Sequence, residues 1–191
     1  MAYTASTGFR FHSSLSSQHS APEPIRFLIA NSTTLRINDS VRVNTSGLAT
    51  GGGAGNPLLG VILGFVDSKG INPFSYGYTG ASGGTLTGDD TLVTASDNST
   101  RANGVYVEVD PDPSGDLLWL NDADGNLAQT NLLQMFDNDA NNRQIAVSTA
   151  SDTSAQWQLI KLDPEATGGK TADASKGLFR IAEKQLITQL G

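Results

Sequence analysis

The chain has 191 residues, a formal net charge of −7 and no cysteine, with 38% hydrophobic and 16% charged residues. This length allows one domain with its own core, or one domain with tails. The acidic balance disfavours binding to nucleic acid or to an anionic membrane, because both need a basic face. Without cysteine the chain has no disulfide, thiolate zinc site or cysteine nucleophile. Frequent Gly, Ser, Thr, Asn and Asp residues favour turns over helix interiors.

The first 24 residues are polar and Ser-rich, and they end in Pro22-Glu23-Pro24, which resists helix. We expect residues 1–24 to form an extended N-terminal arm, and we hypothesise that it docks on a neighbouring subunit; the alternative is a disordered tail. The stretch contains no long apolar run, so a secretory signal peptide is not expected. Elsewhere too, no apolar run reaches the roughly 20 residues of a membrane span.

Strand patterns begin after residue 24. Residues 27–29 form a short apolar run, and Leu35, Ile37, Val41 and Val43 then alternate with polar residues at period two, with a turn at Asn38-Asp39. The glycine-rich stretch 51–57 predicts a loop.

The longest apolar run is 58–66. As a strand it places Leu59, Val61, Leu63 and Phe65 on one bulky face and two glycines, Ile62 and Val66 on a thin face that another backbone can approach. A helix would give Gly60 and Gly64 the spacing of packed membrane helices, but nine residues with two glycines favour the strand.

Residues 71–102 are rich in Gly, Ser, Thr and Asn and have few apolar anchors. We expect a long loop or insertion, either with a weak hairpin or exposed to a partner.

The C-terminal half continues the strand pattern. Residues 105–109 and 117–120 read as a hairpin with its tip at 110–115, and strands are expected at 145–147, 157–162 and 178–182. Two stretches are ambiguous, because 132–136 fits helix or strand and 178–186 also fits a helical spacing. About eight short strands predict an all-β fold, a small antiparallel β-barrel or sandwich, with 25–191 as a single domain.

Catalytic and phosphate-binding patterns each fail at a named residue. Both histidines, His12 and His19, lie in the arm, where a catalytic triad would need the arm folded into a cleft. A phosphate-binding loop ending at Gly169-Lys170 would need a glycine where Pro164 stands. Glu108 is the one carboxylate in mid-strand, and an exposed strand face explains it better than a glycosidase pair. We therefore expect no enzyme, no catalytic residue and no cofactor.

The acidic run 121–126 suggests a calcium loop through Asp122 and Asp124, with Asp137 or Asp139 as further ligands. The EF-hand pattern fails because Leu133 occupies the twelfth position, so a plain Asp/Asn turn is the preferred interpretation. No metal site is assigned, and calcium near Asp122 and Asp124 stays an open alternative.

Four stretches carry a family resemblance: 31–43 as an opening hairpin, 56–70 as a central apolar strand with its charged turn, 157–164 as a penultimate strand, and 177–186 as a terminal strand with Glu183-Lys184-Gln185-Leu186. In these stretches the chain resembles the capsid decoration (cement, or head auxiliary) proteins of tailed bacteriophages. The resemblance covers about 130 residues with gaps, and the long 71–102 stretch departs from it.

The resemblance implies a non-enzymatic structural protein of the virion that binds the outer surface of an assembled phage capsid and stabilises it. Its expected partner is the major capsid protein, and a homo-oligomer, with a trimer favoured, is expected on the capsid; nucleic acid and membrane are not expected partners. A head-fibre or tail component of the virion is a related alternative. The alternative from another class is a carbohydrate-binding β-sandwich, for which Tyr76 and Tyr78 are better platform candidates than Phe74 or the strand residues Trp119 and Trp157.

Overall fold

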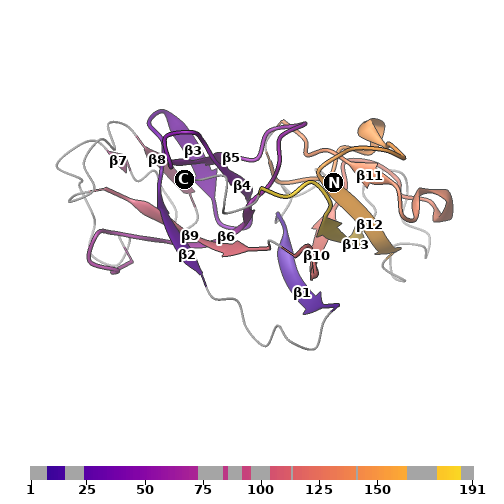
Figure 1. Cartoon of the computed structure of the whole chain (residues 1–191), viewed down its shortest axis with the longest axis horizontal. Coiled ribbons are helices and arrows are strands. Elements are labelled where there is room, and N and C mark those ends of the chain that lie inside the picture. Colours follow the sequence, from indigo (N-terminus) through magenta and orange to yellow (C-terminus); the bar gives the residue numbers. More distant parts are fainter. Residues whose placement is uncertain are drawn as a thin grey trace, which may run out of the picture.

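The regular secondary structure of the protein, seen in a computed structural model, is almost entirely β-strand (Figure 1). The structure describes residues 8–15, 24–72, 104–112, 114–140, 142–162 and 176–185, together with two strands at 84–85 and 92–95. Helix in these residues is limited to two single turns, η3 (Gln129–Asn131) and η4 (Val147–Thr149). The all-β prediction is confirmed.

Sheet A forms one side of the molecule, on the right in Figure 1. Its five antiparallel strands are, in order, β1 (Arg10–Ser14), β10 (Leu117–Asp122), β13 (Lys176–Ile181), β12 (Trp157–Leu162) and β11 (Met135–Phe136). Alternate residues of these strands enter a core that includes Trp119, Trp157 and Phe179. All three side chains are fully buried.

Sheet B lies on the other side, with its own core. Its strands are β2 (Ile25–Leu28), β9 (Tyr106–Pro111), β6 (Gly60–Val66), β4 (Ser40–Val43) and β5 (Ala49–Gly51). The two ends of the sheet approach at one point, where the amide of Ala30 donates to Ala49 O (2.9 Å). Neither sheet is a closed barrel in the described ranges, and two five-stranded antiparallel sheets are consistent with the sandwich form of the prediction.

A third, small sheet contains part of the 71–102 stretch. Sheet C has the order β3 (Thr33–Arg36), β8 (Leu92–Ala95) and β7 (Gly84–Thr85). Strands β7 and β8 pair antiparallel, as a weak hairpin within 71–102 would. The remainder of 73–103 lies outside the described residues.

The described part of the 1–24 segment is attached to its own chain. Strand β1 pairs antiparallel with β10, with a register shift at His12. The buried ring of Phe9, just before the strand, stacks on Trp157 with centroids 4.0 Å apart and planes 7° apart. The extended conformation expected for the arm is thus present at 10–14, where it is a sheet strand.

Strand β6 does not have the single bulky face that its sequence predicts. Val61 lies in the core of sheet A, whereas Leu59, Ile62 and Phe65 lie in the core of sheet B. The register with β9 shifts between Ile62 and Gly64, and this bulge exchanges the two faces of the strand, because side chains alternate with a period of two. The expected close backbone approach is confirmed, since a Cβ on Gly60 would overlap the carbonyl oxygen of Asp110.

Two predicted hairpins are wrong, because consecutive strands enter different sheets. Strand β3 pairs with β8 in sheet C, while β4 pairs with β5 and β6 in sheet B, so 31–43 is not an opening hairpin. Strand β9 pairs with β2 and β6, while β10 pairs with β1 and β13, so 104–120 crosses from sheet B to sheet A. Strand propensity predicts where each strand lies but not which strand it pairs with.

The other C-terminal predictions divide similarly. Strands β12 and β13 confirm the predictions at 157–162 and 178–182, and β13 decides against the helical spacing. In the run 132–136, for which helix and strand were both open, the last two residues form the short strand β11. The strand expected at 145–147 is wrong, because Ile145 makes one isolated bridge to Asn138 and the chain then turns into η4.

Candidate functional surfaces: the polar junction and the N-terminal strands

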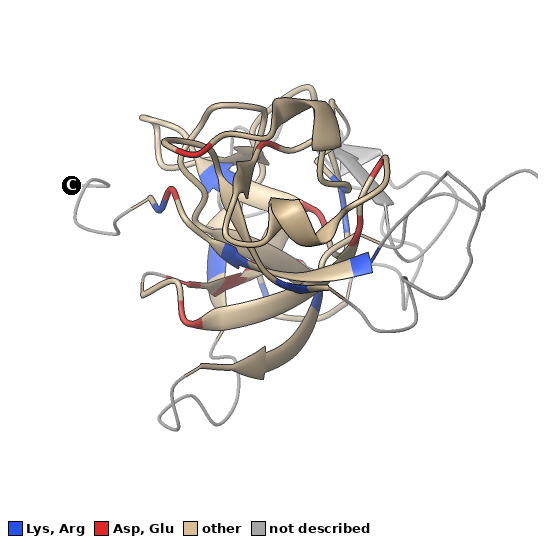
Figure 2. Ribbon diagram, turned by 90° about the vertical axis from the view of Figure 1, so that its right-hand side faces the viewer, with Lys and Arg blue, Asp and Glu red and all other residues tan. Residues whose placement is uncertain are grey.

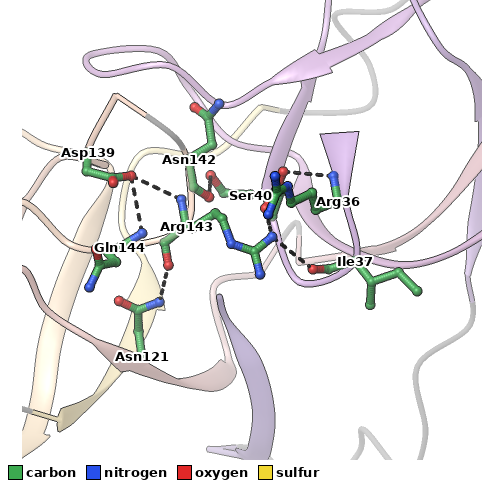
Figure 3. Close-up of polar contacts among 9 residues, drawn as sticks. Arg36, Ile37, Ser40, Asn121, Asp139, Asn142, Arg143 and Gln144 are labelled. Carbon is green, nitrogen blue, oxygen red and sulfur yellow. Dashed lines mark hydrogen bonds and ion pairs between the residues drawn. The ribbon is translucent and has the colours of Figure 1, made fainter. Parts of the chain in front are cut away.

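A cluster of polar side chains joins the loops of sheet A to the segment that connects β3 with β4, and Figure 3 shows the part of it around Arg143. We call it the polar junction, and it consists of Asp39, Ser40, Asn138, Asn142, Arg143 and Gln156. Asp39 lies between β3 and β4 and Ser40 is the first residue of β4, whereas the other four come from the loops that precede β12. Segments about 100 positions apart in sequence therefore meet here, with sequence separations of 98 and 104 residues in two of the bonds.

Arg143 and Asp39 form an ion pair at the centre of the polar junction. The guanidinium Nη1 lies 2.7 Å from Asp39 Oδ1, and the side chains are 17% and 4% exposed. The other carboxylate oxygen accepts a hydrogen bond from the amide of Arg36 (2.8 Å). Burial raises the pKa of Asp39 to about 7, against the opposing effects of Arg143 and the Arg36 amide. The carboxyl therefore titrates near neutrality.

Backbone groups account for much of the remaining bonding in the polar junction. Asn142 O accepts from the amide of Ser40 (3.0 Å), and Asn142 Oδ1 accepts from the amide of Gly53 (2.5 Å). Asn138 Nδ2 donates to Ser40 Oγ (2.7 Å), and Asn138 Oδ1 accepts from Trp157 Nε1 (2.7 Å). These bonds hold the loops of one sheet against the other and satisfy groups that would be costly to bury unpaired.

Gln156 connects three loop carbonyls to one loop amide. Its fully buried side chain donates through Nε2 to Gly53 O (2.6 Å), Asn56 O (2.6 Å) and Gly52 O (3.3 Å). Its Oε1 accepts from the amide of Asn138 (2.9 Å). The glycine-rich loop predicted at 51–57 is thereby fixed to sheet A.

A second buried carboxylate, Asp112, organises the crossing from β9 to β10. Its Oδ1 accepts from the amide of Asp116 (3.0 Å) and its Oδ2 from the amide of Leu117 (3.3 Å). The Asp112 amide donates to Leu59 O (3.0 Å). Burial raises the pKa of Asp112, while these backbone amides lower it. Strand β9 runs on to Pro111, so the turn predicted at 110–115 begins only at Asp112, whose carbonyl accepts from the amide of Gly115 (3.3 Å), and this turn changes sheets; Pro113 lies outside the described residues.

The hydrogen bonds of the polar junction hold loops of sheet A and sheet B together. The Ser40 hydroxyl is held between two asparagines rather than beside an imidazole, so the cluster lacks the nucleophile and base pair of a hydrolase. The sequence predicts turns here, yet no motif identifies Asn138, Asn142, Arg143 or Gln156 as partners, because their contacts depend on the packing of the two sheets. An Asp/Asn-rich run at 137–142 was the only signal available.

The acidic residues of the calcium alternative each contact another group of the protein. Asp122 faces Lys176 at 3.8 Å, and Asp124 Oδ1 accepts from the amide of Val147 (2.7 Å). Asp137 and Asp139 each accept from loop amides, those of Gln156 and Arg143 among them. Among the described residues, no group of three or more His, Asp or Glu side chains is placed to hold a metal ion.

The remaining candidate residues have structural or surface positions. His12 is exposed, with its Nδ1 2.9 Å from Ser13 Oγ, and Glu108 pairs across the strands with Arg26 (2.9 Å) on the surface of sheet B. Trp119 and Trp157 are buried and form no exposed platform for a sugar. His19, Phe74, Tyr76, Tyr78, Pro164 and Gly169-Lys170 lie outside the described residues.

Exposed apolar side chains gather on the two N-terminal strands. Phe11 on β1 is 42% exposed, Leu15 just after it 51%, and Ile25 at the start of β2 37%. We call these three residues the N-terminal apolar surface. Strand β1 is an end strand of sheet A and β2 an end strand of sheet B, and Figure 1 shows the end of β1 and the start of β2 on the same lower side. Ile71 and Leu133 are the other large apolar residues found exposed in the described ranges.

Phe11 is also anchored to the fold. Its ring meets Trp119 edge-on, with centroids 5.9 Å apart and an angle of 77° between the planes. The exposed ring is therefore held in place by a buried neighbour, which lowers the entropy lost when a partner covers it.

Comparisons with known proteins found no relative of this chain. No family model matches the chain, and the searches of curated proteins and of solved structures gave no match. In the part of the chain that the structure describes, no helix has the length and apolar character of a membrane span.

Proposed function

We propose that the chain is a non-enzymatic structural protein of a virus particle, which binds the outside of an assembled capsid and stabilises it. The observation that supports this proposal best is the N-terminal apolar surface. Three large apolar side chains remain exposed, Phe11 on β1, Leu15 just after it and Ile25 at the start of β2, and each of these strands is at the end of its sheet, where a partner can reach it.

The interior of the protein is consistent with this role. The buried polar side chains of the polar junction bind backbone amides and carbonyls, and so fix loops between the sheets. A protein that reinforces a shell benefits from such a rigid body, because an ordered surface loses less entropy on binding. The resemblance of the sequence to phage decoration proteins points in the same direction in its three other stretches, whereas 31–43 does not form the hairpin that the resemblance implied.

Stabilisation of a shell would follow from mass action. A protein that binds only assembled subunits lowers the free energy of the assembled state, and many weak contacts act together when copies are repeated over a surface. In this proposal the partner is the major capsid protein, the chain is a homo-oligomer on the capsid, with a trimer favoured, and it resides on the outer surface of the virion.

The test is a binding experiment with purified capsid shells from which this protein has been stripped. Wild-type chain is added back, beside a variant with Phe11→Ser, Leu15→Ser and Ile25→Ser, and co-sedimentation is measured together with the temperature at which shells rupture. We expect the wild type to bind and raise the rupture temperature, and the triple variant to lose most of both effects.

The matched control is Leu133→Ser, which removes an apolar side chain that is 64% exposed but lies away from β1 and β2. It should bind shells as the wild type does. Wild-type chain that fails to bind shells would refute the proposal. Equal losses in the triple variant and in Leu133→Ser would exclude the N-terminal apolar surface as the contact.

A further inference from the structure

The outward face of sheet A carries a row of side chains with positive charge at both ends. The strand registers align four residues across the sheet: Arg10 of β1, Leu120 of β10, Leu178 of β13 and Lys161 of β12. Their neighbours Trp119 and Phe179 point into the core, so the row faces the opposite way. Figure 2 looks onto this end of the molecule, with Lys and Arg in blue.

Three cations of this face, Arg10, Lys161 and Arg180, have no ion-pair partner among the described residues, whereas Lys176 on the same face pairs with Asp122. Arg10 and Lys161 are exposed, and Arg180 lies half-buried on the same face, with its Nε donating to Gln158 Oε1 (2.8 Å). In the described ranges, no carboxylate lies within ion-pair distance of any of the three. We call Arg10, Lys161 and Arg180 the cationic face. Its charge is notable because the chain as a whole carries −7.

Charge, rather than apolar area, is what this surface offers to a partner. Leu178 is only 8% exposed and Leu120 is half-buried, so the middle of the row presents little exposed apolar surface. The occupant should therefore be acidic.

The loops between β10 and β12 carry the opposite charge. Between β10 and β12 the loops contain four aspartates, Asp124, Asp137, Asp139 and Asp152, against one arginine. That arginine, Arg143, is paired with Asp39 in the polar junction. We call this segment the acidic loops. Asp124 and Asp152 are exposed, and Asp152 follows Ser151, which bridges to Met135 at the edge of β11.

We propose that the cationic face of sheet A binds the acidic loops of a second copy of this chain, so that copies associate head-to-tail. The two surfaces lie on different parts of the molecule, and such a heterologous contact builds a ring when the rotation closes. The biological role of this contact rests on the proposed function, since it would join neighbouring copies on a shell. The contact itself is a property of the isolated chain.

Exposed ion pairs are individually weak and are screened by salt, so the contact should be weak and salt-sensitive. Sedimentation velocity of the full chain over a range of concentrations measures it, at about 50 mM and about 500 mM salt. We expect the wild type to self-associate at low salt and to dissociate at high salt.

Charge reversal gives a test that a merely unfolded variant cannot imitate. Lys161→Glu and Asp152→Lys should each weaken self-association at least tenfold, because each places like charges across the contact. An equimolar mixture of the two variants, or the double variant, should restore it, because the opposite charges face each other again. Lys69→Glu, on an exposed turn after β6, is the control and should associate like the wild type.

Three outcomes would overturn the proposal: a monomeric wild type at low salt, equal effects of Lys161→Glu and Lys69→Glu, or a mixture without rescue. If Lys161→Glu instead abolished binding to duplex DNA or to phosphatidylserine vesicles and left self-association unchanged, the occupant would not be a second copy. None of these results depends on capsid shells, so a failure here differs from a failure of shell binding by the N-terminal apolar surface.

Discussion

Arg143 and Asp39 are 104 positions apart in the chain, yet their side chains form a 2.7 Å ion pair that joins the loops of sheet A to the turn between β3 and β4. Both groups are largely buried, and the carboxylate receives a further hydrogen bond from the Arg36 amide. Removing one member of such a pair leaves a buried charge without compensation, which costs far more than the pair itself contributes.

Arg143→Gln should therefore lower the free energy of unfolding by about 3–5 kcal/mol at pH 8, because Asp39 must then either stay charged without its partner or take up a proton. Urea unfolding followed by tryptophan fluorescence measures the loss, since Trp119 and Trp157 are both buried. The double variant Asp39→Asn/Arg143→Gln should lose less, because no unpaired charge then remains. A double variant no more stable than Arg143→Gln would show that the ion pair is not what the arginine contributes.

The pH dependence of stability follows from the same carboxyl. Burial raises the pKa of Asp39 from 3.8 to about 7, so the folded protein keeps a proton that the unfolded chain releases near pH 4. Stability from this group is therefore full below about pH 4 and is lost as the pH rises through 7. Relative to Asp39→Asn, the wild type should become steadily less stable from pH 4 to pH 8 in urea titrations. A wild type that gains stability relative to the variant over that range would contradict the assigned direction of the pKa shift.

Gln156 should be far more sensitive to substitution than Gln158, two residues later. Gln156→Leu removes bonds to three loop carbonyls and one amide, all buried or partly buried, and should cost about 2–3 kcal/mol in unfolding free energy. Gln158→Leu removes an exposed bond to Leu133 O and one contact with Arg180, and should cost less than about 1 kcal/mol. Similar losses in the two variants would show that the 51–57 loop does not depend on Gln156.

Strand β6 offers a matched pair of glycines. A Cβ on Gly60 would overlap the backbone of Asp110, so Gly60→Ala must displace β9 and should destabilise the protein by about 3 kcal/mol. At Gly64 the Cβ would lie 3.5 Å from Glu108 Oε2, an ordinary contact, and Gly64→Ala should change stability by less than about 1 kcal/mol. Thermal unfolding of both variants decides the point, and a well-tolerated Gly60→Ala would contradict the close approach of β6 and β9.

Local chemistry in the sequence predicts where strands and turns lie, but not which strands pair. The alternation around Leu35 and Val41 gives two strands correctly, whereas their separation into sheets C and B depends on distant strands β8 and β6. The run 110–115 predicts a turn, yet a hairpin and a crossing between sheets need the same turn residues. Pairing is fixed by contacts between segments far apart in sequence, which period and propensity do not encode.

The candidate surfaces show the same division. The burial of Trp119 and Trp157 follows from their strand patterns and was predicted. The bulge at Leu63 was not, and it places Phe65 in the same core as Ile62 rather than in the core of Val61. The polar junction also escaped prediction, because Asn, Gln and Arg residues in loops look alike in sequence until packing selects their partners. For the N-terminal arm, extension was expected, but its pairing with β10 was not.

The central claim, that this is a structural protein of a virus particle, is tested most directly by the composition of purified particles. Quantitative mass spectrometry of virions, with labelled peptides of this chain and of the major capsid protein as standards, measures the copy ratio of the two. The account predicts a fixed ratio that repeats between preparations and persists through gradient purification. Particles that lack the chain, or contain it in traces that wash away, would contradict it.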